Sequence, residues 1–160
     1  MDKLLLRQQV LDRLSEDLQR VEHAVREAHE AATHEENIAE NKYDTLGLEA
    51  AYLATGQARR ADAIRQAFVV WSNFSPLPYN ANQGIQLGAV VRLADAQDNE
   101  LSLFLGPEGG NMTIESCGNS IYVVSSQAPL AKSILGKCVG DEVSLQVGSV
   151  RKIFEVLSVG

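Results

Sequence analysis

Apolar residues recur every seven positions along the first part of the chain. No Gly or Pro interrupts this stretch, and the positions between the apolar ones carry mainly Asp, Glu, Arg and Gln. One apolar series consists of Leu4, Leu11, Leu18, Val25 and Ala32, and a second series, offset by three, consists of Leu14, Val21 and Ala28. Two apolar positions per heptad are typical of a coiled-coil seam, so the pattern predicts one long helix over residues 3–34. Arg7 is the exception, because it stands where the first repeat requires an apolar residue.

A second helical pattern covers roughly residues 44–68. Its core-facing positions are three or four residues apart, with one polar member, and they are Ala50, Leu53, Gln57, Ala61, Ile64 and Phe68. Both patterns become rich in Ala toward the segment that joins them, which allows two helices to approach closely. Helices joined by about ten residues are antiparallel neighbours. We therefore expect an antiparallel helical hairpin, a coiled coil, over residues 1–70, with its tip near 35–44.

The composition changes after residue 68. The next stretch has a loop composition, in which Pro, Asn and Gly stand among aromatic residues: Trp71, Phe74, Pro76, Pro78, Tyr79, Asn80, Asn82 and Gly84. Clusters of Pro, Gly and Asn between periodic segments mark loops. The pattern therefore predicts a linker over residues 71–84 that separates two domains.

From residue 85 onward the apolar residues follow a period of two. Alternating stretches lie at 85–91, 101–105, 121–123, 143–147 and 153–159. Turn-forming residues separate them, at Asp98-Asn99, at 106–110, at Gly140-Asp141 and at Gly148-Ser149. Short alternating runs between such turns indicate strands joined by hairpins.

One short helix interrupts these strands. Pro129 stands in its first turn and Gly136 just beyond its end, which predicts a helix over about residues 128–135. Residues 85–160 are therefore expected to form a small antiparallel sheet with one short helix. The fold class of the whole chain is predicted to be α+β.

Composition and charge exclude several classes of protein. The 160 residues are 45% hydrophobic and 22% charged, which is enough for a folded core. A sequence pI near 4.9 gives no basic footprint for duplex nucleic acid. No apolar run reaches the length of a signal-peptide core or a membrane span, so we expect a cytoplasmic protein without membrane contact. Cys117 and Cys138 are not spaced as a metal or redox motif, and we expect reduced core thiols.

The negative charge is concentrated at the predicted tip. Residues 27–49 contain seven acidic residues and one Lys, a local net charge of −6 against −7 for the whole chain. Glu35, Glu36, Glu40 and Asp44 are carboxylates on this turn, and carboxylates suit Mg²⁺. A convex tip cannot exclude water, so any chemistry would take place inside the cavity of another protein. The alternatives are a docking role, in which the charge steers the tip toward a basic surface, and a merely solvated loop.

Other motifs fail on spacing. His29 and His34 are five residues apart, whereas a zinc-protease helix requires histidines four apart so that both face one metal ion. The run at 106–110 lacks the Lys-Ser/Thr of a phosphate-binding loop, and we interpret it as a hairpin loop. All three histidines lie in the predicted helical arm, so the sheet domain has no Ser-His-Asp constellation.

The segment at 128–143 carries a family resemblance. It reads Ala-Pro-Leu-Ala-Lys-Ser-Ile-Leu-Gly-Lys-Cys-Val-Gly-Asp-Glu-Val, and it follows a helical hairpin with an acidic turn. This arrangement resembles the bacterial Gre transcription elongation factors, GreA and GreB. The segment 40–44 is loosely similar to the corresponding tip region of that family. The resemblance extends in architecture over the whole chain, and its most specific part is 128–143.

The resemblance implies a partner and a mechanism. The C-terminal domain, FKBP-like in fold, would bind the rim of the secondary channel of bacterial RNA polymerase, and the hairpin tip would enter that channel. The implied polymerase-binding residues are Pro129, Leu130, Ala131, Lys132, Gly136 and Lys137. The implied tip residues, which would help the polymerase to position Mg²⁺ for cleavage of back-tracked RNA, are Glu36, Asn37, Glu40 and Asp44.

Several expectations about partners follow from the same resemblance. The protein is expected to be a monomer that holds no metal or cofactor by itself, and to contact the RNA 3′ end only through the polymerase. It would regulate transcription without being an enzyme, since at most it would stimulate the polymerase's own Mg²⁺-dependent cleavage.

The tip departs from the family pattern at one position. Cleaving Gre factors carry an Asp three residues before the tip Glu, and alignment on Glu40 places Asn37 there. This predicts weak or absent stimulation of RNA cleavage. Two alternatives from other functional classes remain: an FKBP-type prolyl isomerase with a helical arm, and a helical-hairpin interaction module without polymerase binding. A proline pocket requires convergent aromatic residues, and the sheet domain offers Phe104, Tyr122 and Phe154, with Tyr79 at its edge.

Overall fold

A computed structural model describes residues 2–38 and 46–160. Their contacts divide the chain into two compact units. One unit is Asp12–Phe68, and the other combines Met1–Leu11 with Val69–Gly160. The second unit therefore contains the sheet domain together with the first turns of one long helix and the last turn of the other.

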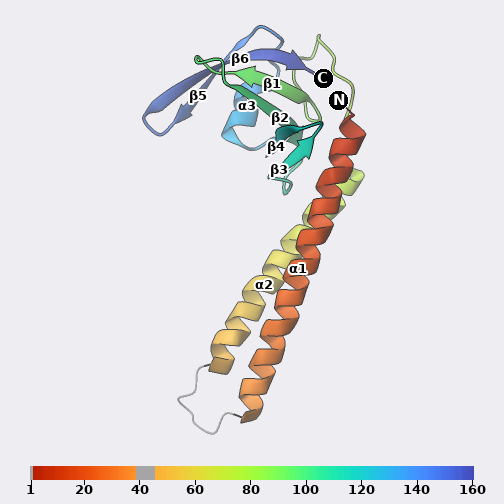
Figure 1. Cartoon of the computed structure of the whole chain (residues 1–160), viewed down its shortest axis with the longest axis vertical. Helices are drawn as coiled ribbons and strands as arrows, with labels where there is room; N and C mark the ends of the chain where they lie inside the picture. Colours follow the sequence, from red (N-terminus) through yellow and green to blue (C-terminus); the bar gives the residue numbers. More distant parts are fainter. Residues whose placement is uncertain (1, 39–45) are drawn as a thin grey trace. The chain divides into compact units, whose positions relative to one another are not determined.

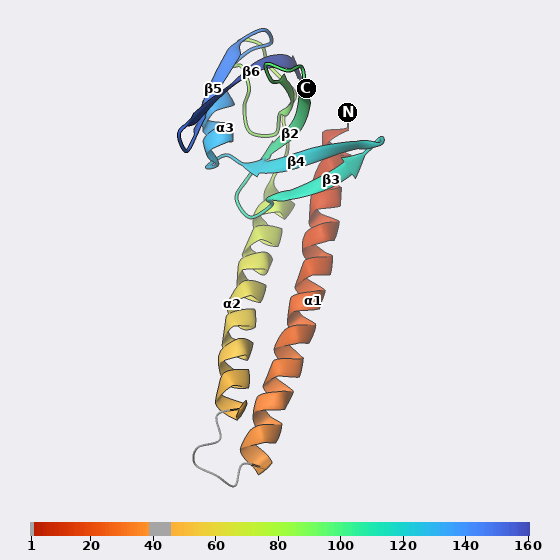
Figure 2. The ribbon, with the colours of Figure 1, turned by 60° about the vertical axis from the view of Figure 1, so that its left-hand side comes forward.

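The helical unit consists of two antiparallel helices that run side by side (Figures 1 and 2). Helix α1 spans Lys3–Ile38, so the predicted helix is confirmed and continues four residues beyond its expected end. Helix α2 spans Leu46–Asn73. Leu14, Val21 and Ala28 are buried at intervals of seven, whereas Leu18 and Val25 are half-buried. The second apolar series is therefore the more deeply buried side of the seam.

An ion pair joins the two helices within this unit. The Arg65 guanidinium contacts the Glu22 carboxylate at 2.9 Å and Asp62, one turn earlier on its own helix, at 2.6 Å. The hydrogen bond with Glu22 is the first cause of a raised pKa of Arg65. Because both side chains are largely exposed to solvent, this pair adds little to stability, and the buried apolar seam holds the two helices together.

The end of α2 corrects the predicted linker. The helix continues through Trp71 to Asn73, and Trp71 is fully buried. A residue that precedes Pro is disfavoured in helical geometry, so Pro76 ends the helix a few residues upstream. Trp71 therefore belongs to the helix and its core, although the sequence around it has a loop composition.

The sheet has six strands in the order β3-β4-β2-β1-β6-β5. The strands are β1 Val90–Ala94, β2 Glu100–Gly106, β3 Met112–Ser116, β4 Asn119–Ser125, β5 Glu142–Val147 and β6 Val150–Val159. All neighbouring pairs are antiparallel except β2 and β4, which are parallel. The α+β class is confirmed, while the sheet is mixed rather than purely antiparallel.

Two local predictions about the sheet were wrong, and one strand was missed. Residues 85–89 form a turn, with the Ala89 N–H donating to the Gln86 carbonyl at 3.0 Å, and β1 begins only at Val90. Strand β3 has too few apolar residues to have been predicted. The segment 106–110 is not a hairpin loop, because β4 lies between the two strands that it connects.

The main core of this unit lies between the sheet and the short helix α3, Pro129–Ile134. Its fully or almost fully buried members come from four strands and α3, and they include Val91, Leu93, Leu103, Leu105, Ala131, Ile134, Val143 and Val156. The alternate residue Phe104 points to the opposite face, where its ring lies 6.0 Å from that of Trp71. Both faces of the central strands are therefore covered.

The cysteines are not core residues, which corrects a further prediction. Cys117 is exposed in the turn between β3 and β4, and Cys138 is half-buried. Both are free thiols. The turn places Cys117 at φ +53°, an unusual conformation for a residue other than Gly or Asn.

Candidate functional site

The short helix α3 contains most of the predicted docking segment. Pro129 occupies its start, where a missing N–H removes no helical hydrogen bond. The carbonyl of the extended residue Ala128 accepts the first bond, from the Lys132 N–H at 3.0 Å. Gly136 follows the helix at φ +80°, the left-handed conformation that commonly ends helices. The local sequence thus explains both ends of the helix.

The six predicted docking residues differ in their exposure. Ala131 is fully buried in the core, and Leu130 is half-buried and packs against that core. The exposed members are Pro129, Lys132, Gly136 and Lys137. A partner could therefore contact the two lysines and the backbone around Gly136, whereas Leu130 and Ala131 hold α3 on the sheet.

Backbone hydrogen bonds join the end of α3 to the segment around Ile85. The Gly136 N–H donates to the Ile85 carbonyl at 2.8 Å, and the Ile85 N–H donates to the Lys137 carbonyl at 2.8 Å. Gly84, at φ +72°, lies so close that a Cβ there would approach the Gly136 oxygen to 2.4 Å. Sequence reasoning missed this contact, because it assigned Gly84 only to a loop. The paired glycines allow two stretches of backbone to touch.

Cys138 directly follows Lys137 and interacts with Tyr79. The Cys138 thiol donates to the Ala81 carbonyl at 3.7 Å, and its backbone N–H donates to the Asp141 carboxylate at 2.8 Å. Desolvation is the first cause of a raised pKa of Tyr79, and a hydrogen bond with Cys138 and the nearby Asp141 carboxylate add to it. The phenol therefore stays protonated at neutral pH and remains a hydrogen-bond donor beside the docking segment.

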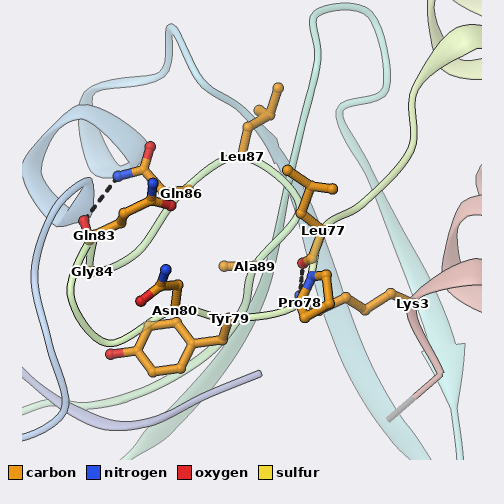
Figure 3. Close-up of a pocket in the computed structure, with 10 residues that line it drawn as sticks. All are labelled: Lys3, Leu77, Pro78, Tyr79, Asn80, Gln83, Gly84, Gln86, Leu87 and Ala89. Carbon is orange, nitrogen blue, oxygen red and sulfur yellow. Dashed lines mark hydrogen bonds between the residues drawn. The ribbon is translucent and has the colours of Figure 1, made fainter.

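A pocket of about 250 Å³ lies inside the loop that precedes β1 (Figure 3). The Lys3 ammonium donates to the Leu77 carbonyl at 2.7 Å, and the Gln86 amide donates to the Gln83 carbonyl at 3.0 Å. Desolvation lowers the pKa of Lys3. Lys3 and Tyr79 are the titratable lining residues, so the pocket lacks a carboxylate or histidine for acid–base catalysis.

The same pocket bears on the prolyl-isomerase alternative. Tyr79 is its one aromatic lining residue. Phe104 packs beside Trp71, Phe154 packs against the main core, and Tyr122 is 45% exposed on β4. These aromatic residues do not converge on one pocket, so the arrangement does not favour proline recognition.

The tip residues are only partly within the described structure. Glu36 and Asn37 lie in the last turn of α1, whereas Glu40 and Asp44 lie outside the described residues. Within residues 2–38 and 46–160, no group of three or more His, Cys, Asp or Glu could hold a metal ion. The roles of the four tip residues therefore stay predictions from sequence.

The fold defines a class: an α+β protein with a long helical hairpin and a sheet domain, in which one short helix carries most of the predicted docking segment. The family model "Transcription elongation factor, GreA/GreB, C-term" matches residues 80–160. This match covers just over half of the chain and the whole of α3, so the chain belongs to the GreA/GreB family of transcription elongation factors. No helix in the described part of the chain is both long and apolar enough to span a bilayer.

Solved structures of related proteins are similar to the chain over most of its length. GreA factor homolog 1 (Gfh1) of Thermus thermophilus is 26% identical, with 94% of each chain covered and a TM-score of 0.41. Gfh1 of Thermus aquaticus is 28% identical, with 92% of each chain covered and a TM-score of 0.40. GreA/GreB from Nitrosomonas europaea is 17% identical over 61% of this chain and 78% of its own, with a TM-score of 0.39. A comparison with curated proteins found no match.

Proposed function

We propose that this chain regulates transcription elongation by binding bacterial RNA polymerase through its sheet domain and inserting its hairpin tip into the secondary channel. The observation that carries the proposal is the family match over residues 80–160, which includes the complete docking segment. Lys132 and Lys137 are exposed on that segment and provide positive charge for an acidic partner surface.

The long helices supply the reach that the proposal requires. Within the helical unit, α1 runs from Asp12 to Ile38. At a rise of 1.5 Å per residue, this part of the helix extends over about 40 Å. An arm of that length, with acidic residues at its end, suits entry from a protein surface into a deep and narrow channel.

The chemistry that we propose at the tip is limited. Glu40 supplies one carboxylate, and Asn37 offers a neutral amide oxygen where a cleaving factor has Asp. A neutral oxygen is a poorer ligand for a hard cation such as Mg²⁺. The protein would therefore occupy the channel and compete with cleavage factors, while it stimulates cleavage weakly or not at all. It needs no cofactor of its own, because the polymerase holds the Mg²⁺.

A charge-reversal experiment tests the docking. Lys132→Glu combined with Lys137→Glu should weaken polymerase binding at least tenfold, because both side chains are exposed on the proposed contact surface. The matched control is Arg151→Glu with Lys152→Glu, which makes the same charge change on β6. Leu130 is left intact, because its packing against the core makes a charge there disruptive to the fold.

The measurement is the dissociation constant of labelled protein and bacterial RNA polymerase core enzyme, with circular dichroism to confirm folding. Equal loss of affinity in both double variants would indicate that only net charge matters. Unchanged affinity in the α3 variant would place the contact elsewhere. If the wild-type protein does not bind polymerase, the proposed function is wrong.

A further inference from the structure

The single Trp of the chain lies in an enclosed position at the end of α2. Trp71 is fully buried, and its ring lies 5.6 Å from that of Phe74 and 6.0 Å from that of Phe104. It belongs to residues 69–73 of α2, which are part of the same compact unit as the sheet. Its side chain therefore attaches the last turn of this helix to the sheet.

Two glycines leave the space that the indole occupies. A Cβ on Gly106 would lie 2.2 Å from the Trp71 Cη2 atom, and a Cβ on Gly110 would lie 2.4 Å from its Cζ2 atom. Neither glycine has a positive φ, so the backbone at both positions would accept Ala. The two glycines are therefore required by the volume of the Trp71 ring and not by their own conformation. We call these two positions the glycine socket.

Packing and a backbone contact hold Trp71. Its indole N–H is buried and has no hydrogen-bond partner among the residues that the structure describes. The Trp71 carbonyl, in contrast, accepts a hydrogen bond from the Arg7 guanidinium of α1 at 3.0 Å. One residue thus connects α1 through its backbone and the sheet through its ring.

We propose that Trp71 in the glycine socket is a positioning residue, which couples the binding of the sheet domain to the action of the helical hairpin. This inference rests on the proposed function. If the socket is blocked, the sheet domain keeps its docking segment on α3 and still binds polymerase. The last turn of α2 then loses its attachment to the sheet, so occupancy of the polymerase no longer produces the full effect of the tip.

Fluorescence of the single Trp tests the socket itself. Gly106→Ala and Gly110→Ala should each shift the emission to longer wavelength and increase quenching by acrylamide, because the added methyl group displaces the ring. Gly56→Ala is the control, since a Cβ there meets nothing within 4 Å and its backbone is helical. Unchanged emission in both socket variants would overturn the proposed socket.

A size-compensating pair separates a lost contact from general misfolding. Gly106→Ala should lower the thermal midpoint in the wild-type background and lower it much less with Trp71→Phe, because the shorter ring leaves room for the methyl group. Trp71→Phe removes no hydrogen bond to any residue within 2–38 or 46–160. Additive changes in the two backgrounds would contradict a direct contact between these positions.

Polymerase assays test the positioning role. Gly110→Ala should bind RNA polymerase within about twofold of the wild-type affinity, whereas its maximal inhibition of factor-stimulated RNA cleavage at saturation should fall at least fivefold. Adding Trp71→Phe should restore part of that inhibition. If affinity and maximal inhibition fall together, Trp71 only stabilises the fold and the inference is wrong. If the wild-type protein does not bind polymerase, the proposed function and the positioning role both fail, while the fluorescence result still judges the socket.

Discussion

Arg7 shows how one residue can break a sequence pattern for a structural reason. It occupies the same heptad position as the buried residues Leu14, Val21 and Ala28, where an apolar side chain is expected. Its guanidinium donates to the carbonyl oxygens of Trp71 and Ser72 in the last turn of α2. The last carbonyls of a helix lack intrahelical partners, and a cation there also interacts favourably with the helix dipole. Arg7 therefore caps the neighbouring helix.

We expect Arg7→Leu to destabilise the protein although it completes the apolar pattern. The loss should be about 1–2 kcal/mol, because two carbonyls lose a charged donor and only part of this is offset by apolar burial. Arg7→Lys is the conservative control and should lose less, since it keeps the charge but not the forked geometry. Urea unfolding and amide hydrogen exchange in the last turn of α2 provide the measurement. A stabilised Arg7→Leu variant would show that the seam matters more than the cap.

At the scale of elements, local sequence patterns predicted where helices and strands form better than they predicted which strands pair. The heptad pattern predicted α1, and Pro129 with Gly136 predicted α3, because each pattern depends on residues that are close together in the sequence. The parallel pairing of β2 with β4 depends on contacts between distant segments, so alternation could not reveal it. The docking segment stays a prediction from its sequence. Gly84 could not be recognised from the sequence, because the reason for a glycine there is its contact with Gly136 across the fold.

The contact between Gly84 and Gly136 at the end of α3 gives a prediction at the scale of elements. Gly84→Ala should cost about 2–4 kcal/mol, since it combines a left-handed conformation with a collision against the Gly136 backbone. Gly148→Ala is the matched control, because Gly148 also has a positive φ but a Cβ there meets nothing within 4 Å. The control should cost only about 1–2 kcal/mol. Chemical denaturation measures both, and equal costs would mean that the backbone contact adds nothing.

At the scale of the whole molecule, charge and exposed chemistry are divided between two places. The sheet domain offers Lys132 and Lys137 on its docking segment, and residues 27–49 hold a local net charge of −6. The family match supports the first place, since it begins at residue 80. Glu40 and Asp44, which complete the second, lie outside the described residues, so their function can be argued only from residue type and order. Binding and tip chemistry can therefore be altered by separate substitutions.

This separation gives the last prediction, which concerns cleavage. Asn37→Asp should raise Mg²⁺-dependent cleavage of back-tracked RNA about tenfold, which corresponds to about 1.4 kcal/mol of transition-state stabilisation, because a second carboxylate can help to hold the weakly bound metal ion. Glu40→Ala should remove the cleavage that the wild-type protein supports. Both variants should bind polymerase as the wild type does, because neither position belongs to the docking segment. The measurement is the rate of RNA shortening in a stalled elongation complex at saturating protein. If the wild-type protein already cleaves as fast as an active Gre factor, Asn37 does not limit the reaction, and Glu36 or Asp44 must provide the second carboxylate.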